Sequence, residues 1–313
     1  MCFNVVIINK RKKDIRTQVF NLLIYARYNR DGFSIYTVDK DGEKVYRTLD
    51  FNKFLEYLRE NVKNNEIVHM HFRAASSGTI SLKNVHMWKV ESNDESNEYY
   101  YVSHNGFVHK FSRFTYVSPN IYYWGRMLST VSKNKIAKMI NKELEEITKE
   151  EIESDTLQFI KTEDFRKALF ENLNDFNEVL EKYSFWGVLF ATNPKRCVIV
   201  SYGKPVHIIL SNSVLYFSNE DITSLVSGRK KIYGFDFLDA LHTTYEDVVI
   251  VFDAARMSIE KTIKLERKVY YFAKEHYCLN NKKNKNVKSV GRENEELDEE
   301  TLKSLDEAYW WYY

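Results

Sequence analysis

Cys2 directly follows the first methionine, and this position can give it a second reactive group in addition to its thiol. Methionine aminopeptidases remove Met1 when the next side chain is small, so we expect the mature chain to begin at Cys2. An N-terminal cysteine carries a nucleophilic thiol and a free α-amine, and the amine has a pKa of about 7.7–8.0. One residue can then act as nucleophile and general base together. The sequence therefore predicts an N-terminal nucleophile.

Five short motifs follow Cys2 in the chain. They are His71-Phe72-Arg73-Ala74-Ala75-Ser76-Ser77-Gly78, Asn84-Val85-His86, Ser103-His104-Asn105-Gly106, Ser154-Asp155-Thr156 and Tyr216-Phe217-Ser218-Asn219-Glu220. Together with Met1-Cys2 and a strand pair expected at residues 186–191 and 196–201, they resemble the class II glutamine amidotransferase domain. That domain is an N-terminal-nucleophile (Ntn) hydrolase. The resemblance extends from Cys2 to about Asp253.

The resemblance implies a mechanism for Cys2. The thiol would attack the side-chain amide of glutamine and form a γ-glutamyl thioester, while the α-amine moves the proton, through a water, to the departing ammonia. Asn105 and Gly106 match the oxyanion hole, in which a side-chain amide and a backbone N–H stabilise the developing negative charge. The alternative for Asn105-Gly106 is a hairpin turn, since Asn-Gly is the strongest short-range turn signal.

The resemblance also implies a substrate clamp. Arg73 would hold the α-carboxylate of glutamine, because a guanidinium binds carboxylates bidentately. Asp155 would hold the α-ammonium, and the hydroxyl of Ser76 could hydrogen-bond the bound amino acid. The alternatives are an ordinary ion pair for Arg73 at a strand end and a helix cap at residues 154–156.

His86 occupies the family's Asn-x-His position, and we expect it to hold the loop beneath the site. His69, His71, His104 and His109 lie close together in the sequence, but no set of cysteines or carboxylates at metal-ligand spacing accompanies them. We therefore expect no metal. We also expect no cofactor, since neither a phosphate-binding nor a dinucleotide-binding glycine motif is present.

Three positions depart from the family pattern. Phe3 replaces the usual glycine after the nucleophile and could crowd the oxyanion region. Ala74 replaces an aromatic residue of the loop that covers glutamine, which indicates a different lid. Met87 replaces the proline of Asn-x-His-Pro. None of the three removes a catalytic group, so the mechanism is better defined than the substrate.

Hydrophobic periodicity predicts an α+β fold. We expect strands at residues 2–8, 33–38, 67–75, 99–103, 185–191, 196–201, 206–210, 215–218 and 248–253, and helices at 14–29, 51–62, 132–144, 165–183 and 221–226. Strands, then helices, then strands suit two sheets with helices on their outer faces. The resemblance implies the same four-layer αββα Ntn-hydrolase sandwich.

The chain changes character near residue 255. We expect an amidotransferase-like domain at 1–255, followed at 256–313 by a C-terminal helix (257–276) and a charged tail with aromatic residues at 309–313. Some fifty residues are too few for a second catalytic domain. The resemblance therefore implies a stand-alone glutaminase-type subunit that supplies ammonia to a separate acceptor enzyme. The helix and tail are candidate docking elements, and an oligomer is possible.

Composition and charge bear on the class of protein and on its location. The formal net charge is +2, which gives no argument for nucleic acid, and no apolar run approaches a membrane span. Three widely spaced cysteines do not make a disulfide framework. We expect a cytoplasmic protein that binds L-glutamine or a related small amide. Two alternatives stay open: a γ-glutamyl or other small-amide hydrolase without an acceptor, and an inactive binding scaffold.

Overall fold

The computed structural model describes residues 2–111, 152–227, 229–232, 235–238 and 240–267. All of them belong to the larger of the two compact units into which the chain divides, and that unit extends through Arg267. The expected helix at 132–144 and the aromatic end at 309–313 lie outside the described residues.

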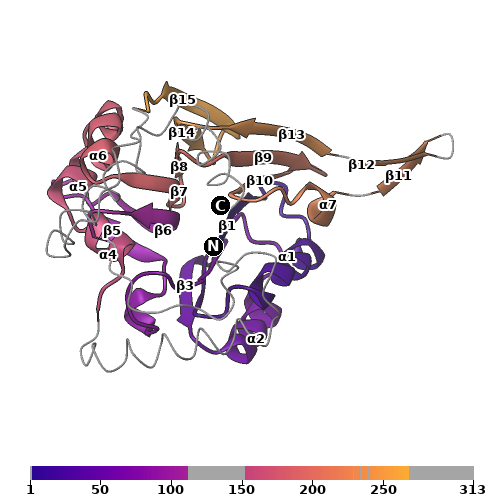
Figure 1. Cartoon of the computed structure of the whole chain (residues 1–313). Coiled ribbons are helices and arrows are strands. Elements are labelled where there is room, and N and C mark those ends of the chain that lie inside the picture. The colour runs from indigo at the N-terminus through magenta and orange to yellow at the C-terminus, as the bar shows by residue number, and fades with distance from the viewer. Residues whose placement is uncertain (1, 112–151, 228, 233–234, 239, 268–313) are drawn as a thin grey trace, which may run out of the picture. The chain divides into compact units, whose positions relative to one another are not determined.

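Most described residues build two antiparallel sheets (Figure 1). The first sheet has seven strands in the order β13-β9-β10-β1-β4-β2-β3, so β1 is central. Their bounds are β1 Phe3–Ile8, β2 Phe33–Asp39, β3 Gly42–Thr48, β4 Ile67–Phe72, β9 Val206–Ser211, β10 Val214–Ser218 and β13 Ala240–Tyr245.

The second sheet has six strands in the order β15-β14-β8-β7-β6-β5. Their bounds are β5 Trp88–Glu91, β6 Tyr99–Val108, β7 Phe185–Thr192, β8 Arg196–Tyr202, β14 Val248–Asp253 and β15 Ser258–Lys264. A separate two-stranded ribbon joins β11 Arg229–Ile232 and β12 Phe235–Leu238.

Three layers of buried side chains hold four layers of secondary structure together. The layer between the sheets contains Val6 of β1, Phe190 of β7 and Ile250 of β14, among others. A second layer joins the outer face of the first sheet to α1 (Arg16–Leu22), α2 (Phe51–Asn61) and α7 (Thr223–Val226). A third joins the second sheet to α4 (Asp155–Ile160), α5 (Glu163–Phe170) and α6 (Phe176–Lys182). Figure 1 shows the two helix groups on opposite sides of the sheets, and the predicted α+β αββα sandwich is confirmed.

Side chains that accept backbone hydrogen bonds fix where several helices begin. Asp50 accepts from two backbone N–H groups at the start of α2, and Thr162 does so from Phe165 at the start of α5. Such caps satisfy donors that the first turn leaves open. Three short 3₁₀ segments are also present among the described residues. Leu23–Arg27 extends α1, Leu82–Asn84 precedes β5, and Leu173–Asp175 precedes α6.

The structure corrects three element predictions. Part of the expected C-terminal helix at 257–276 is the strand β15, which pairs with β14 as an edge strand. The expected helix at 165–183 is two helices, because Asn172 caps a new 3₁₀ turn and interrupts the first. The strand expected to end at residue 103 continues as β6 to Val108. No helix among the described residues has the length and apolar character to cross a bilayer.

Candidate active site

Cys2 lies at the entry to the central strand β1. Because Phe3 pairs with Phe72 in antiparallel register, Cys2 stands opposite Arg73 at the end of β4. The thiol contacts the backbone of the next residue: Sγ accepts from the N–H of Ala74 at 3.4 Å and lies 3.5 Å from its carbonyl oxygen. Burial raises the pKa of the Cys2 thiol above its ordinary value. The resting thiol is therefore protonated, and attack needs a base.

Asn219 anchors the strand that carries Cys2. Its side-chain Nδ2 donates to the carbonyl oxygen of Cys2 at 3.3 Å, and its Oδ1 accepts from the N–H of Asn4. Its own backbone N–H donates to the carbonyl of Asn4 at 3.2 Å. The sequence motif at 216–220 contained Asn219, but its contact with a residue 217 positions away could not be read from the motif.

Asn105 and Gly106 lie inside β6, where they pair with Val188 and Gly187 of β7, so the hairpin-turn alternative is wrong. Gly106 has φ +157°, and a Cβ there would lie 1.9 Å from the carbonyl oxygen of Trp186. Only glycine allows β6 and β7 to approach so closely at this point. The Asn-Gly pair thus serves a strand-to-strand contact and not a chain reversal.

The side chain of Asn105 points into the layer between the sheets. Alternate residues of a strand face opposite sides, and Ser103 of the same face hydrogen-bonds Asn4 of the first sheet at 2.7 Å. Along this face Tyr101 packs against Tyr36, with the rings tilted and their centroids 4.6 Å apart, so the order Tyr101, Ser103, Asn105 runs toward the Cys2 end of β1. Asn105 is 1% exposed, and its Nδ2 has no hydrogen-bond partner among the described residues. A buried amide donor without a partner is costly and requires an explanation.

Arg73 is 2% exposed and holds the loop that follows it. Its Nη2 donates to the carbonyl of Ser77 at 2.9 Å, and its Nη1 donates to that of Thr79 at 3.1 Å. Burial lowers the pKa of the Arg73 guanidinium, while negative charge on Cys2, Asp31 and Asp155 opposes that effect. Sequence analysis missed Asp31, whose Oδ2 accepts from the N–H of Ala75 at 2.8 Å.

Asp155 begins α4 and ties it to β6. Its Oδ2 accepts from the N–H of Val108 and its Oδ1 from that of Thr156, both at 2.8 Å. Its backbone N–H donates to Ser77 Oγ at 3.1 Å, which brings Asp155 to the Arg73 loop. The helix-cap alternative applies to the neighbouring Ser154, which accepts from Leu157. Ser76 is half-buried, and its hydroxyl makes no hydrogen bond within the described part of the chain.

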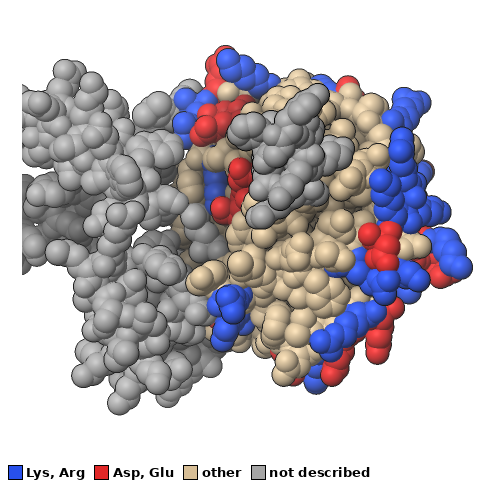
Figure 2. All heavy atoms as spheres, turned by 90° about the vertical axis from the view of Figure 1, so that its right-hand side faces the viewer, with Lys and Arg blue, Asp and Glu red and all other residues tan. Residues whose placement is uncertain are grey.

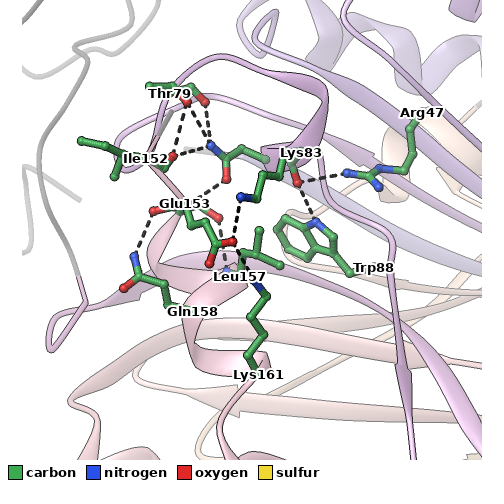
Figure 3. A network of polar contacts seen from close by, with 11 residues as sticks. Arg47, Thr79, Lys83, Trp88, Ile152, Glu153, Leu157, Gln158 and Lys161 are labelled. Atoms are coloured by element: carbon green, nitrogen blue, oxygen red, sulfur yellow. Dashed lines mark hydrogen bonds and ion pairs between the residues drawn. The ribbon is translucent and has the colours of Figure 1, made fainter. Parts of the chain in front are cut away.

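A polar network fastens the Arg73 loop to the segment that carries Asp155 (Figure 3). Asn84 Nδ2 donates to the carbonyl of Ile152 at 2.7 Å, and Asn84 Oδ1 accepts from the N–H of Ser154 at 2.8 Å. Close by, Glu153 accepts ion pairs from Lys83 at 2.9 Å and Lys161 at 2.6 Å. The expected clamp residues therefore come from two loops that are held together as one unit.

Histidines occupy the interior beside this unit. His86 Nδ1 accepts from the N–H of His104 at 3.1 Å, directly before Asn105, and the His86 ring stacks on His71 at 3.7 Å between centroids. His69 Nε2 contacts Ser103 Oγ at 2.5 Å. Burial lowers the pKa of His69 and His104 to about 3, so both are neutral at pH 7. Within the described ranges, no group of three or more metal-ligating side chains is placed to hold a metal ion.

Phe3 does not crowd the oxyanion region, contrary to the expectation from its size. It faces the helix side of its sheet, where its ring stacks on Tyr25 with 4.1 Å between centroids. Met87 is buried between the sheets with φ +73°, and Ala74 supplies the backbone groups that contact Cys2. Phe3 and Ala74, the two departures nearest the site, thus leave the Cys2 thiol in contact with peptide backbone.

The surface adds little to the site. Figure 2 shows Lys and Arg side chains interspersed with Asp and Glu side chains along the edge of one face, with uncharged residues across much of its middle.

Known structures share this architecture. The chain matches the glutamine phosphoribosylpyrophosphate amidotransferase of B. subtilis, complexed with ADP and GMP, at 13% identity and a TM-score of 0.51, over 85% of this chain and 50% of that one. It matches the allosteric regulatory enzyme of purine biosynthesis at 11% identity and a TM-score of 0.51, over 86% and 50%. The chain thus spans about half the length of these structures. No family model and no curated protein matches it.

Proposed function

We propose, from a chain with the Ntn-type fold of glutamine amidotransferases, that this protein hydrolyses the side-chain amide of glutamine through Cys2. The fold itself carries no chemistry, and function has to be argued from the site. The proposal therefore depends on what the residues around Cys2 are arranged to do.

The unpartnered amide of Asn105 carries the proposal. Its Nδ2 is buried, lies in the layer between the sheets toward the Cys2 end of β1, and has no partner among the described residues. An oxyanion hole needs such a donor, because the donor must be oriented before the negative charge develops and must not be occupied by the protein. A tetrahedral oxyanion formed by attack of Cys2 would complete the hydrogen bonding of Asn105.

The proposed reaction has two stages. After Met1 is removed, the Cys2 thiol transfers its proton to its own α-amine through a water, and sulfur attacks the amide carbon. Asn105 and the backbone N–H of Gly106 stabilise the oxyanion. Collapse breaks the C–N bond as the nitrogen takes the proton, so ammonia leaves and a γ-glutamyl thioester remains. Water then attacks the thioester, which releases glutamate and restores the thiol.

The clamp for the amino acid part of the substrate is formed by Arg73, Asp155 and Ser76. Arg73 and Asp155 already hold backbone groups, so substrate would replace some of those hydrogen bonds as it binds. A guanidinium has five N–H donors and a carboxylate accepts several bonds, so both can hold loop and substrate together. Ser76 brings a hydroxyl that is uncommitted within the described residues. In this proposal His86 supports the strand of Asn105 through His104.

The ammonia would be used by a separate acceptor enzyme, since ammonia released to solvent is lost. We place this reaction in the cytoplasm and assign it no cofactor. The proposed domain that performs it ends near residue 255 on the sequence pattern, although the compact unit that holds the site includes β15 and reaches Arg267.

Ammonia release from L-glutamine tests the proposal, with the N-terminal mass measured on the same purified sample. Cys2→Ala should abolish release, and hydroxylamine should trap γ-glutamyl hydroxamate from the wild-type chain. Cys197→Ala is the matched control, because Cys197 is fully buried between the sheets and burial raises the pKa of its thiol to about 12. It should release ammonia at nearly the wild-type rate.

Two results would count against the proposal. A chain that begins at Cys2 and releases no ammonia from glutamine, but does so from γ-glutamyl compounds or other small amides, would make it a hydrolase of another amide. A chain that retains Met1 and binds glutamine without turnover would favour the inactive scaffold, because the α-amine would then belong to the wrong residue.

A further inference from the structure

Lys204 is a buried cation close to the nucleophile. It lies in the turn between β8 and β9 and is 7% exposed. Its Nζ lies 3.6 Å from Oε1 of Glu220 and 6.0 Å from the centroid of the Trp186 ring. Burying an ammonium is costly unless it is paired, so a lysine kept in this position needs a reason.

The turn that presents Lys204 is tightly fixed. Gly203 has φ +69°, and a Cβ there would lie 2.4 Å from Cδ1 of Trp186. The N–H of Gly203 donates to Asp247 Oδ1 at 2.7 Å, and the hydroxyl of Ser201 donates to the carbonyl of Lys204. Contacts of the backbone therefore fix the position of Lys204 independently of its side chain.

A chain of polar contacts connects Lys204 to Cys2. Glu220 Oε1, which pairs with Lys204, also accepts from Asn219 Nδ2 at 2.9 Å. The same Nδ2 donates to the carbonyl of Cys2, and Asn219 Oδ1 accepts from the N–H of Asn4. Because Asn219 holds the backbone on both sides of Phe3, the orientation of its amide fixes the entry of β1.

Charge gives a second connection. Burial lowers the pKa of the Lys204 ammonium, and the negative charges of Glu220 and of the Cys2 thiolate oppose that effect. The attraction is mutual, so a positive charge on Lys204 favours the thiolate over the thiol. Glu220 pairs with this ammonium, and as a like charge it would disfavour the thiolate that Lys204 favours.

We propose that Lys204 is a positioning residue for the nucleophile: it fixes Cys2 through Glu220 and Asn219, and it places a positive charge beside this chain of contacts. The proposal rests on Cys2 being the nucleophile of the proposed function. It adds a residue outside the five motifs that carried the resemblance, and it assigns opposite electrostatic effects to two paired side chains.

The test is the pH dependence of Cys2 alkylation by iodoacetamide, followed by mass spectrometry of the N-terminal peptide. Lys204→Met keeps the length of the side chain and removes its charge, so the midpoint of the profile should rise by about one pH unit, with about tenfold slower alkylation near pH 7.5. Lys204→Arg keeps the charge and should restore the wild-type midpoint. Glu220→Gln should lower the midpoint, because it removes the opposing charge.

A merely structural ion pair would behave differently. In that case Lys204→Met and Glu220→Gln would shift the midpoint in the same direction or leave it unchanged, and either result overturns the proposal. If Lys204→Met does not fold, the other two variants decide the question. A wild-type midpoint for Lys204→Arg with a lower midpoint for Glu220→Gln supports the proposal, and an unchanged or higher midpoint for Glu220→Gln overturns it. Lys182→Met is the control, because it removes an exposed ion pair between Lys182 of α6 and Asp164 of α5 and should not move the midpoint.

The alkylation test does not require glutamine. A wild-type chain that releases no ammonia but shows opposite shifts for the Lys204 and Glu220 variants would overturn the proposed function and leave this inference in place. Cys2-dependent ammonia release with unchanged alkylation midpoints would support the proposed function and overturn this inference.

Discussion

The layer between the two sheets has an apolar half and a polar half, although the same strands contribute to both. Toward the end of β1 farther from Cys2, the layer consists of apolar residues such as Ile8, Ile67 and Leu215, which pack against one another. Toward Cys2, the same layer contains Asn4, His71 and other polar groups, several of whose nitrogen atoms have no partner among the described residues. Apolar burial stabilises folding, whereas unpartnered buried polar groups oppose it. The difference indicates that the polar half is kept for chemistry and depends on the apolar half for stability.

Acid should affect the two halves most differently. His69, His71, His86 and His104 are buried, and burial holds the pKa of each well below its ordinary value of 6.5. Below pH 6.5 the unfolded chain binds protons on these histidines and the folded chain does not. For His69 and His104, stability is therefore complete above pH 6.5 and falls as the pH decreases toward about 3, by about 1.4 kcal/mol per pH unit for each. His71 and His86 act in the same direction.

Urea unfolding at a series of pH values measures this slope. His69→Gln should reduce the slope by about the contribution of one histidine. An equal slope for wild type and His69→Gln would show that His69 does not contribute to the acid sensitivity.

Phe217→Ala should give the largest loss of stability from a single substitution among the apolar residues between the sheets. Phe217 is fully buried and packs edge-on against Phe252 with 5.1 Å between ring centroids. Removing the ring leaves a cavity between two sheets that cannot collapse, so the free energy of unfolding should fall by about 3–5 kcal/mol. Folded Phe217→Ala should still alkylate at Cys2 at the wild-type rate, and a large rate change would contradict the division into halves.

The elements around the apolar half were the easiest to predict from sequence. The apolar run that became β1 showed its burial directly. The strand expected at 67–75 is β4, which ends at Phe72, so Arg73 directly follows it. Strand β15 was taken for a helix because its residues are mostly charged and exposed, so it shows no apolar alternation. An edge strand is specified by its neighbour, here β14, more than by its own pattern.

The site was less predictable than the fold. The motifs named Cys2, Arg73, Asn105 and Asp155, but not what holds them. The contacts of Asn219 with Cys2 and of Asn84 with Ile152 join positions 217 and 68 residues apart. Side-chain hydrogen bonds over such distances leave no periodic signal in a sequence, so only the folded chain reveals them.

Asn105→Ala should separate activity from stability within the polar half. Its Nδ2 makes no hydrogen bond to any described residue, so its removal should change the unfolding midpoint little. Loss of one oxyanion donor should lower kcat by about 10²–10³-fold. The control on the same strand face is Ser103→Ala, which breaks hydrogen bonds to Asn4 and His69 and should cost about 1–3 kcal/mol of stability with a smaller effect on kcat. If Asn105→Ala mainly destabilises the fold, its amide is structural.

The smallest effect should come from Asn84→Ala, which loosens the unit that joins the two clamp loops without touching Cys2. The substitution leaves the carbonyl of Ile152 and the N–H of Ser154 without the side chain that satisfies them, so it should cost about 1–3 kcal/mol of stability. Because Arg73 and Asp155 would then be held less firmly relative to each other, KM for glutamine should rise more than kcat falls.

Lys161→Ala is the matched control for Asn84→Ala, because it breaks a neighbouring but exposed ion pair with Glu153. Exposed pairs contribute at most about 1 kcal/mol, so this variant should change neither KM nor stability much. A kcat loss without a KM change in Asn84→Ala would mean that the network positions Asn105 or Cys2 and not the clamp. That outcome would extend the polar half beyond the sheets, into the loops that Figure 3 shows.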